Sequence, residues 1–310
     1  MRTAQGGAAK VGLIGFGEAA SAFVEGWRKT RALEFSAFDI KTDSPSEPVR
    51  EAKRRDYERL GVAGAATPAG ALAGVNTVFS LVTADQALDA AKTAAPHLEP
   101  GAFFFDCNSC SPGAKRQAAE AVTAAGARYI DTAVMAPVHP TLHRTPLLLS
   151  GPDADEALAL ALALDMDAKT VPGGVGAASA NKMVRSIMMK GLEALVLECV
   201  LAGRKAGVDE AVLASLDVSF PGFGWKRRAA YMMERAATHG IRRAAEMREV
   251  AQTVRELGLS GAMADATAGW EQKIGDLRVR AGDANAKDAE DYGALADLIL
   301  RHLDNGKTGD

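Results

Sequence analysis

The chain has 310 residues, which is enough for two moderate domains with their own hydrophobic cores, and two domains is the better expectation. A formal net charge of -3 creates no field that would attract nucleic acid or an anionic membrane surface. The chain has no apolar run of about 18 residues to span a bilayer and no signal-peptide pattern at its N-terminus, so we expect a soluble, cytoplasmic protein with no nucleic-acid or membrane partner.

The first half of the chain alternates short apolar runs with alanine-rich helical stretches, the pattern of βαβ units that build a parallel sheet. Strands are expected at residues 10–14, 33–38, 62–63, 77–82, 102–105, 128–130 and 147–149. Helices are expected at residues 18–28, 85–95, 113–125 and 155–164. The pattern predicts an α/β fold, a Rossmann-type doubly wound, mostly parallel sheet, over residues 1–173.

The second half, residues 174–310, shows no convincing strand and predicts an all-α domain. Its first helix is expected at residues 177–206, where apolar residues recur at spacings of three and four until Gly207 stops the pattern. Further helices are expected at residues 209–216, 226–237, 241–257, 262–274 and 288–303. A first helix of roughly 30 residues is unusually long for a globular protein and indicates a strut between domains or the core of a homodimer.

Cysteine and histidine are sparse. Three cysteines are too few for a disulfide framework and fit a reducing compartment. Cys107 and Cys110 form a C-x-x-C pair, but no second pair of Cys or His stands nearby to complete a zinc site. We therefore expect no metal and interpret this pair as structural.

A glycine-rich turn joins the first expected strand to the first expected helix. Gly15, Gly17 and Ala20 form G-x-G-x-x-A in this context, which is the fingerprint of a dinucleotide-binding turn. Gly15 permits the tight turn, Gly17 lets the backbone approach the pyrophosphate, and Ala20 allows the helix to pack on the strand. The expected cofactor contacts at this turn are Gly15, Phe16, Gly17, Glu18 and Ala19.

Asp39 ends the second expected strand, about 20 residues after the turn, where a carboxylate accepts hydrogen bonds from the adenosine ribose. A carboxylate there repels the 2′-phosphate of NADP, so Asp39 favours NAD. Lys41 lies two residues further on and could pair with a 2′-phosphate if its side chain turned inward. NAD is therefore the expected cofactor, and NADP stays possible.

Three further motifs follow the turn: D-C-N-S-C-S-P at 106–112, D-T-A-V-M-A-P at 131–137, and G-V-G-A-A-S-A-N-K at 174–182. With the turn, they resemble in order the motifs of the β-hydroxyacid dehydrogenases, which include 3-hydroxyisobutyrate and 6-phosphogluconate dehydrogenase. The resemblance covers almost the whole chain. The helical half, with Phe-Pro-Gly-Phe at 220–223, is similar to a poorly characterised branch of that family. The resemblance implies NAD(P)-dependent hydride transfer with a β-hydroxy acid or β-hydroxy amino acid.

The resemblance also assigns roles to residues of this chain. Lys182 falls on the catalytic lysine, and Ser186 stands where the family has an asparagine that touches the substrate hydroxyl. The remaining implied contacts are Asn108 and Ser109 for the substrate acid group, and Val82 and Thr83, with Asn108, at the nicotinamide.

Chemistry supports the role of Lys182. Hydride transfer from a secondary alcohol requires removal of the hydroxyl proton, and a lysine with a lowered pKa can act as that base. An ordinary lysine, with a pKa near ~10.4, is a poor base at neutral pH. The apolar neighbour Met183 and the charge of Arg185 would both lower the pKa of Lys182. Outside this motif, an isolated lysine at a helix start would be a solvated side chain.

The third motif departs from the family after its first half. Met135, Ala136 and Pro137 replace a Ser-Gly-Gly whose backbone contacts the substrate acid group. Substrate recognition must therefore be built differently, which argues against 3-hydroxyisobutyrate or 6-phosphogluconate itself as the substrate.

The helical half concentrates aromatic and basic residues at 220–228, followed by His239, Arg242 and Arg243. One interpretation is a solvated helix face with aromatic anchors, and the other is a substrate-facing role in which an arginine binds a carboxylate or phosphate bidentately. Arg185 and His239 are the candidate substrate-binding residues of this half.

Two alternative functions remain at this point. Imine reductases resemble this architecture but replace the catalytic lysine, so Lys182 argues against that activity. A non-catalytic NAD-binding or sensing protein is suggested by the altered third motif and by Ser186 in place of the asparagine.

Overall fold

The computed structural model describes residues 9–284, 288 and 291–305. The chain forms two compact units, Met1–Met183 and Val184–Asp310, here called the first and the second unit. They divide inside helix α7 (Ala177–Ala206), whereas the division expected at residue 173 precedes that helix. Within the described ranges, no helix is both long and apolar enough to cross a membrane.

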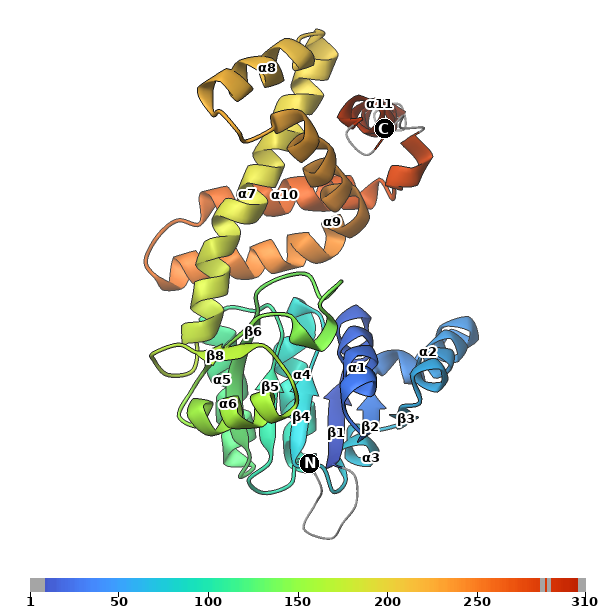
Figure 1. The fold of residues 1–310 in the computed structure, drawn as a ribbon, viewed down its shortest axis with the longest axis vertical. Coiled ribbons are helices and arrows are strands. Elements are labelled where there is room, and N and C mark those ends of the chain that lie inside the picture. The colour runs from blue at the N-terminus through green and yellow to red at the C-terminus, as the bar shows by residue number, and fades with distance from the viewer. Residues whose placement is uncertain (1–8, 285–287, 289–290, 306–310) are drawn as a thin grey trace. The chain divides into compact units, whose positions relative to one another are not determined.

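The first unit is built on one eight-stranded sheet with the order β3-β2-β1-β4-β5-β6-β7-β8 (Figure 1). The strands are β1 (Ala9–Ile14), β2 (Leu33–Phe38), β3 (Ala63–Gly64), β4 (Thr77–Ser80), β5 (Phe103–Asp106), β6 (Arg128–Val134), β7 (Leu147–Ser150) and β8 (Ala168–Thr170). Only the pairing of β6 with β7 is antiparallel among these strands. This order confirms the predicted doubly wound Rossmann-type sheet, in which the strand order reverses between β1 and β4 and leaves a ligand crevice at their carboxyl ends.

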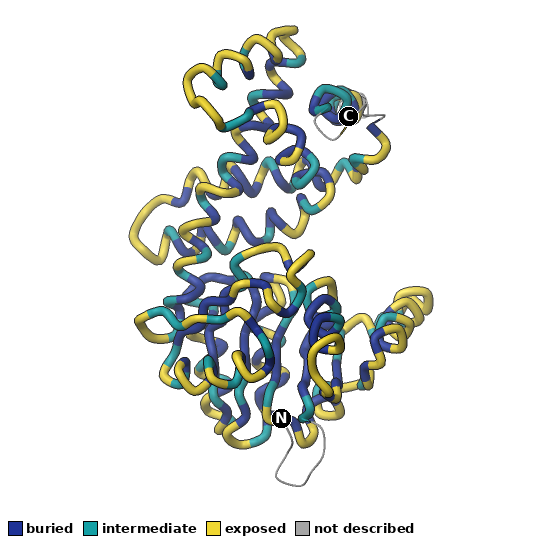
Figure 2. Tube along the Cα trace, viewed as in Figure 1, coloured by how far each residue is buried: buried dark blue, intermediate teal, exposed yellow. Residues whose placement is uncertain are grey.

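Helices cover both faces of this sheet, so its central strands are mostly apolar. The helices are α1 (Glu18–Thr30), α2 (Glu47–Leu60), α3 (Pro68–Leu72), α4 (Ala87–Ala94), α5 (Pro112–Ala124) and α6 (Ala154–Ala163). Phe79 and Phe105 stack at 4.6 Å between ring centroids on one face, and their neighbours Val78 and Phe104 belong to a separate core on the other. Figure 2 shows the central strands as buried.

Helix α2 is the longest element of the first unit that the apolar pattern does not predict. Its sequence is strongly charged, and its buried residues are only Lys53, Tyr57 and Leu60. They stand at intervals of four and three, so they do form one face, but a lysine holds one of its three positions. Apolar periodicity alone therefore does not predict this helix.

The second unit is helical throughout its described residues and contains most of α7, then α8 (Asp209–Ser219), α9 (Trp225–Glu256), α10 (Ala262–Asp276) and α11 (Tyr292–Asn305). The expectation of two helices at 226–237 and 241–257 is wrong, because α9 runs unbroken through both. Gly240 does not end the helix. A Cβ at Gly240 would lie 2.4 Å from the Glu271 carbonyl oxygen and 2.8 Å from the Gly275 nitrogen, so glycine is there to let α10 approach.

Candidate functional site

The glycine turn has the backbone that a dinucleotide needs. Gly15 has φ +84°, and a Cβ there would lie 2.6 Å from the carbonyl oxygen of Leu81. At Gly17 a Cβ would meet nothing within 4 Å, so the backbone is open to approach. Gly17 is also the N-cap of α1, and no side chain caps the first turn of that helix. Its N–H groups are thus available to a pyrophosphate, and the residues of the turn fit the cofactor.

Asp39 is bound to the backbone on both sides of its carboxylate. Its Oδ2 accepts a hydrogen bond from the Phe16 N–H at 2.7 Å, and its Oδ1 accepts one from the Lys41 N–H at 2.9 Å. The same carboxylate therefore fixes the glycine turn and the end of β2. The structure brings Asp39 and Phe16, two of the expected cofactor contacts, together, while the side chain of Lys41 is exposed.

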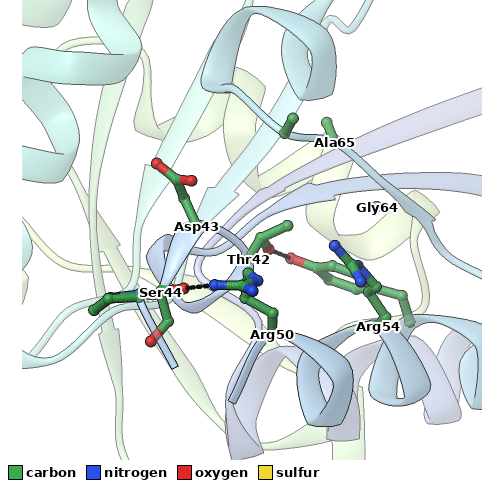
Figure 3. Close-up of a pocket in the computed structure, with 10 residues that line it drawn as sticks. Thr42, Asp43, Ser44, Arg50, Arg54, Gly64 and Ala65 are labelled. Carbon is green, nitrogen blue, oxygen red and sulfur yellow. Dashed lines mark hydrogen bonds between the residues drawn. The ribbon is translucent and has the colours of Figure 1, made fainter. Parts of the chain in front are cut away.

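A hollow of about 730 Å³ begins three residues after Asp39 and is lined by hydroxyl and guanidinium groups (Figure 3). Thr42 Oγ1 and Tyr57 Oη lie 3.1 Å apart, and Arg50 Nη1 donates to the Ser44 carbonyl oxygen at 2.5 Å. Arg54 also lines the hollow. Burial raises the pKa of Tyr57 to about 12, so its hydroxyl keeps its proton at neutral pH.

Two carboxylates and a lysine form a fully buried cluster at the carboxyl end of β5 and the middle of β6. Asp106 and Asp131 are paired in register across these strands, and neither side chain is exposed. Lys115 of α5 places its Nζ 3.1 Å from Asp106 Oδ1 and 3.5 Å from Asp131 Oδ1. Burial alone would lower the pKa of Lys115, but the two carboxylates raise it above its usual value, so Lys115 is charged.

Asp106 holds the loop of the second motif. Its Oδ1 accepts hydrogen bonds from the Asn108 N–H at 3.0 Å and from Asn108 Nδ2 at 2.8 Å. Asn108 Nδ2 also donates to Ser80 Oγ at 2.9 Å, and the Val82 N–H donates to Asn108 Oδ1 at 2.7 Å. The Asn108 amide thus joins the ends of β4 and β5 and leaves the neighbouring Ser109 hydroxyl partly exposed.

Asp131 holds the start of α7. Its Oδ2 accepts hydrogen bonds from the N–H groups of Gly176 and Ser179, each at 3.0 Å. Lys182 follows within one helical turn, and its Nζ donates to Ser109 Oγ at 2.5 Å. Two motifs therefore meet in the first unit through residues 73 positions apart in sequence, each motif anchored by one carboxylate of the buried cluster.

Cys107 and Cys110 are both buried beside this cluster. Burial raises the pKa of the Cys107 thiol to about 12, with the Lys115 charge opposing this shift. The thiol is therefore protonated and unreactive at neutral pH, which agrees with a structural interpretation of the pair.

The segment that replaces the Ser-Gly-Gly of the third motif continues into a loop held against α1. Val138 and His143 of this loop are buried. His143 lies so close to Gly26 of α1 that a Cβ at Gly26 would be 2.1 Å from His143 Nδ1. Met135 itself is half-buried and Ala136 and Pro137 are exposed, so the altered residues precede the part of the loop that packs in the core.

The other candidate substrate residues belong to the second unit. Ser186 is buried on α7, Arg185 is exposed on the same helix, and His239 is half-buried on α9. Sequence reasoning missed Lys115 and Lys53, although both carry a signal: each occupies the buried stripe of its helix among apolar residues.

Comparison with known proteins identifies the family of this chain. Residues 10–176 match the model of the NAD-binding domain of 6-phosphogluconate dehydrogenase, and residues 204–274 match a domain of unknown function. A conserved hypothetical protein from Sinorhizobium meliloti is 34% identical, with a TM-score of 0.71, over 95% of this chain and 96% of its own.

Two characterised structures share the fold at lower identity. The 3-hydroxyisobutyrate dehydrogenase of Mycobacterium tuberculosis is 14% identical, with a TM-score of 0.66, over 94% of this chain and 99% of its own. A reductive aminase from Aspergillus terreus is 18% identical, with a TM-score of 0.53, over the same shares of 94% and 99%. The chain therefore belongs to the family defined by the NAD-binding domain of 6-phosphogluconate dehydrogenase, as a divergent branch of the β-hydroxyacid dehydrogenases.

Proposed function

We propose that the protein is an NAD-dependent oxidoreductase that transfers a hydride between nicotinamide and a β-hydroxy acid or β-hydroxy amino acid. The observation that carries this proposal is the contact of Lys182 Nζ with Ser109 Oγ at 2.5 Å. It lies in the unit that holds the glycine turn, and it joins a candidate base to a candidate substrate-binding hydroxyl.

Each residue has one task in this reaction. When bound, NAD⁺ supplies the acceptor for the hydride that leaves the carbinol carbon. Neutral Lys182 takes the hydroxyl proton as the carbonyl forms, and the ammonium returns it in the reverse reduction. Ser109 holds the substrate acid group and orients Lys182. Because the side chain of Asn108 already makes hydrogen bonds to three protein groups, its part is to fix this loop.

Residues of the second unit complete the proposal. Ser186 contacts the substrate hydroxyl, and Arg185 and His239 select the remainder of the substrate. A homodimer is proposed as the working form. NAD is proposed over NADP because the Asp39 carboxylate stands at the end of β2, where it accepts hydrogen bonds from an unphosphorylated ribose.

The test is a screen of NAD- and NADP-coupled oxidation across a broad panel of β-hydroxy acids and β-hydroxy amino acids, with reduction of cyclic imines measured in parallel. The proposal expects oxidation of at least one hydroxy acid and faster turnover with NAD. Imine reduction without hydroxy-acid oxidation would replace the proposal with an imine reductase. Cofactor binding with neither activity would favour a binding or sensing protein.

A further inference from the structure

Lys53 is a buried cation at the adenosine end of the cofactor site. It projects from α2, and only 6% of the residue is exposed. Its Nζ donates a hydrogen bond to the Phe16 carbonyl oxygen of the glycine turn. The same Nζ lies 3.2 Å from Asp56 Oδ2 and 3.9 Å from Asp39 Oδ2. Lys53 thus contacts both the turn and the carboxylate expected to bind the ribose.

The pair of Lys53 and Asp39 is shielded from solvent. Their side chains are 7% and 12% exposed, so water and salt screen this pair much less than a surface ion pair. Asp56 shares the Lys53 charge, but 43% of its side chain is exposed and its carboxylate is better screened. Lys53 therefore shares its charge between the nearer, exposed carboxylate of Asp56 and the carboxylate of Asp39, and only the pair with Asp39 is shielded from solvent.

The neighbouring hollow adds little net charge of its own. Arg50 and Arg54 line it, and both pair with the single carboxylate of Glu47. Asp43 lines the hollow as well (Figure 3). Two positive and two negative groups leave the hollow close to neutral, so the Asp39–Lys53 pair and the exposed Lys41 set the field that a ribose substituent meets.

We propose that Lys53 is the residue that sets cofactor choice in this protein. An unpaired carboxylate at Asp39 would exclude a 2′-phosphate by repulsion between like charges. With Lys53 beside it, the carboxylate is largely neutralised, and the site accepts NADP as well as NAD with only weak preference for NAD. This inference rests on the cofactor half of the proposed function and is independent of the hydroxy-acid chemistry.

Equilibrium binding of NADH and NADPH, followed by nicotinamide fluorescence, tests the proposal in the full chain. For the wild type, the two dissociation constants should agree within roughly tenfold. Lys53→Met should weaken NADPH roughly tenfold more than NADH, because the Asp39 charge is then uncompensated. Lys29→Met, which removes an exposed lysine paired with Glu25 on α1, is the control and should leave the ratio unchanged.

A purely structural role for Lys53, as an anchor of the Phe16 carbonyl, would weaken both cofactors equally and would overturn the proposal. Asp39→Asn in the Lys53→Met background should return the ratio of the NADPH and NADH dissociation constants to the wild-type value. A ratio that stays shifted in this double variant would also contradict the proposal.

Asp39→Asn in the otherwise native chain gives a test that does not depend on the folding of Lys53→Met. Because the Lys53 charge is then left without its carboxylate, this variant should raise the affinity for NADPH relative to NADH by roughly tenfold. An unchanged ratio would show that the charges of this pair do not act on a ribose substituent and would overturn the proposal. Failure to oxidise any hydroxy acid would contradict the proposed activity and leave these binding constants untouched.

Discussion

Lys115 and Lys53 stand on the buried stripes of α5 and α2, where a helix normally presents apolar residues. Each is held by carboxylates of the sheet region: Lys115 by Asp106 at the end of β5 and Asp131 within β6, and Lys53 by Asp39 just after β2. A buried lysine is stable only with such partners, because an unpaired charge costs several kcal/mol to remove from water. A lysine within the apolar face of an expected helix therefore indicates that an acidic residue pairs with it in the folded protein. The sequence alone does not identify that acidic residue.

Removing Lys115 should leave two buried carboxylates without their cation. We expect Lys115→Met to lower the free energy of unfolding by about 3–5 kcal/mol, measured by urea denaturation at neutral pH. Lys92→Met, which changes an exposed lysine on α4, is the matched control and should stay within about 0.5 kcal/mol of wild type. Equal stability of the two variants would mean that Asp106 and Asp131 do not depend on Lys115.

Cys107 should make the protein less stable in alkali. The pKa of its thiol rises from 9.0 to about 12 on folding, so between these values the folded state holds a proton that the unfolded state releases. Stability then falls as pH rises through this window, by up to about 1.4 kcal/mol per pH unit for one proton. Urea denaturation at neutral pH and within the window should show a smaller loss for Cys107→Ala than for wild type. If Cys107→Ala and the wild type lost the same stability between the two pH values, the proton retained on folding would not belong to Cys107.

Apolar periodicity predicts the bounds of helices and strands well where core packing and intrinsic propensity favour the same element. The bounds of α7 and β2 are those expected, because both have uninterrupted apolar patterns with clear ends. The apolar pattern does not reveal helix α2 because a lysine lies in its buried face, and the break expected in α9 between residues 237 and 241 contains Gly240. Position 240 requires a glycine because the backbone of α10, about 30 residues later in the sequence, lies against it. The sequence around Gly240 does not indicate this distant contact.

The crossing of α9 and α10 should tolerate no side chain at Gly240. Gly240→Ala would push a Cβ against the backbone of α10, and we expect a loss of about 1–3 kcal/mol in the free energy of unfolding. Gly269→Ala on α10 is the control, since its Cβ would meet nothing within 4 Å. That substitution should be neutral or stabilise by up to about 1 kcal/mol. Similar effects of the two changes on thermal or urea unfolding would contradict the close packing at Gly240.

For the whole molecule, the sequence predicts the doubly wound sheet, the helical second half and the family. Motif order also places the two candidate site residues, Ser109 after β5 and Lys182 in the first turns of α7. It does not predict what holds them. The cluster of Asp106, Lys115 and Asp131 depends on strand register and on side chains from α5 that have no motif of their own.

The central claim is that Lys182 moves the substrate proton, and the most direct test compares Lys182→Ala with wild type on the best hydroxy-acid substrate. The account predicts that kcat falls by about 10²–10⁴-fold, while the dissociation constant for NADH stays unchanged because the glycine turn is untouched. Lys169→Ala, at an exposed lysine of β8, should keep full activity. Turnover by Lys182→Ala at the wild-type rate would contradict the account.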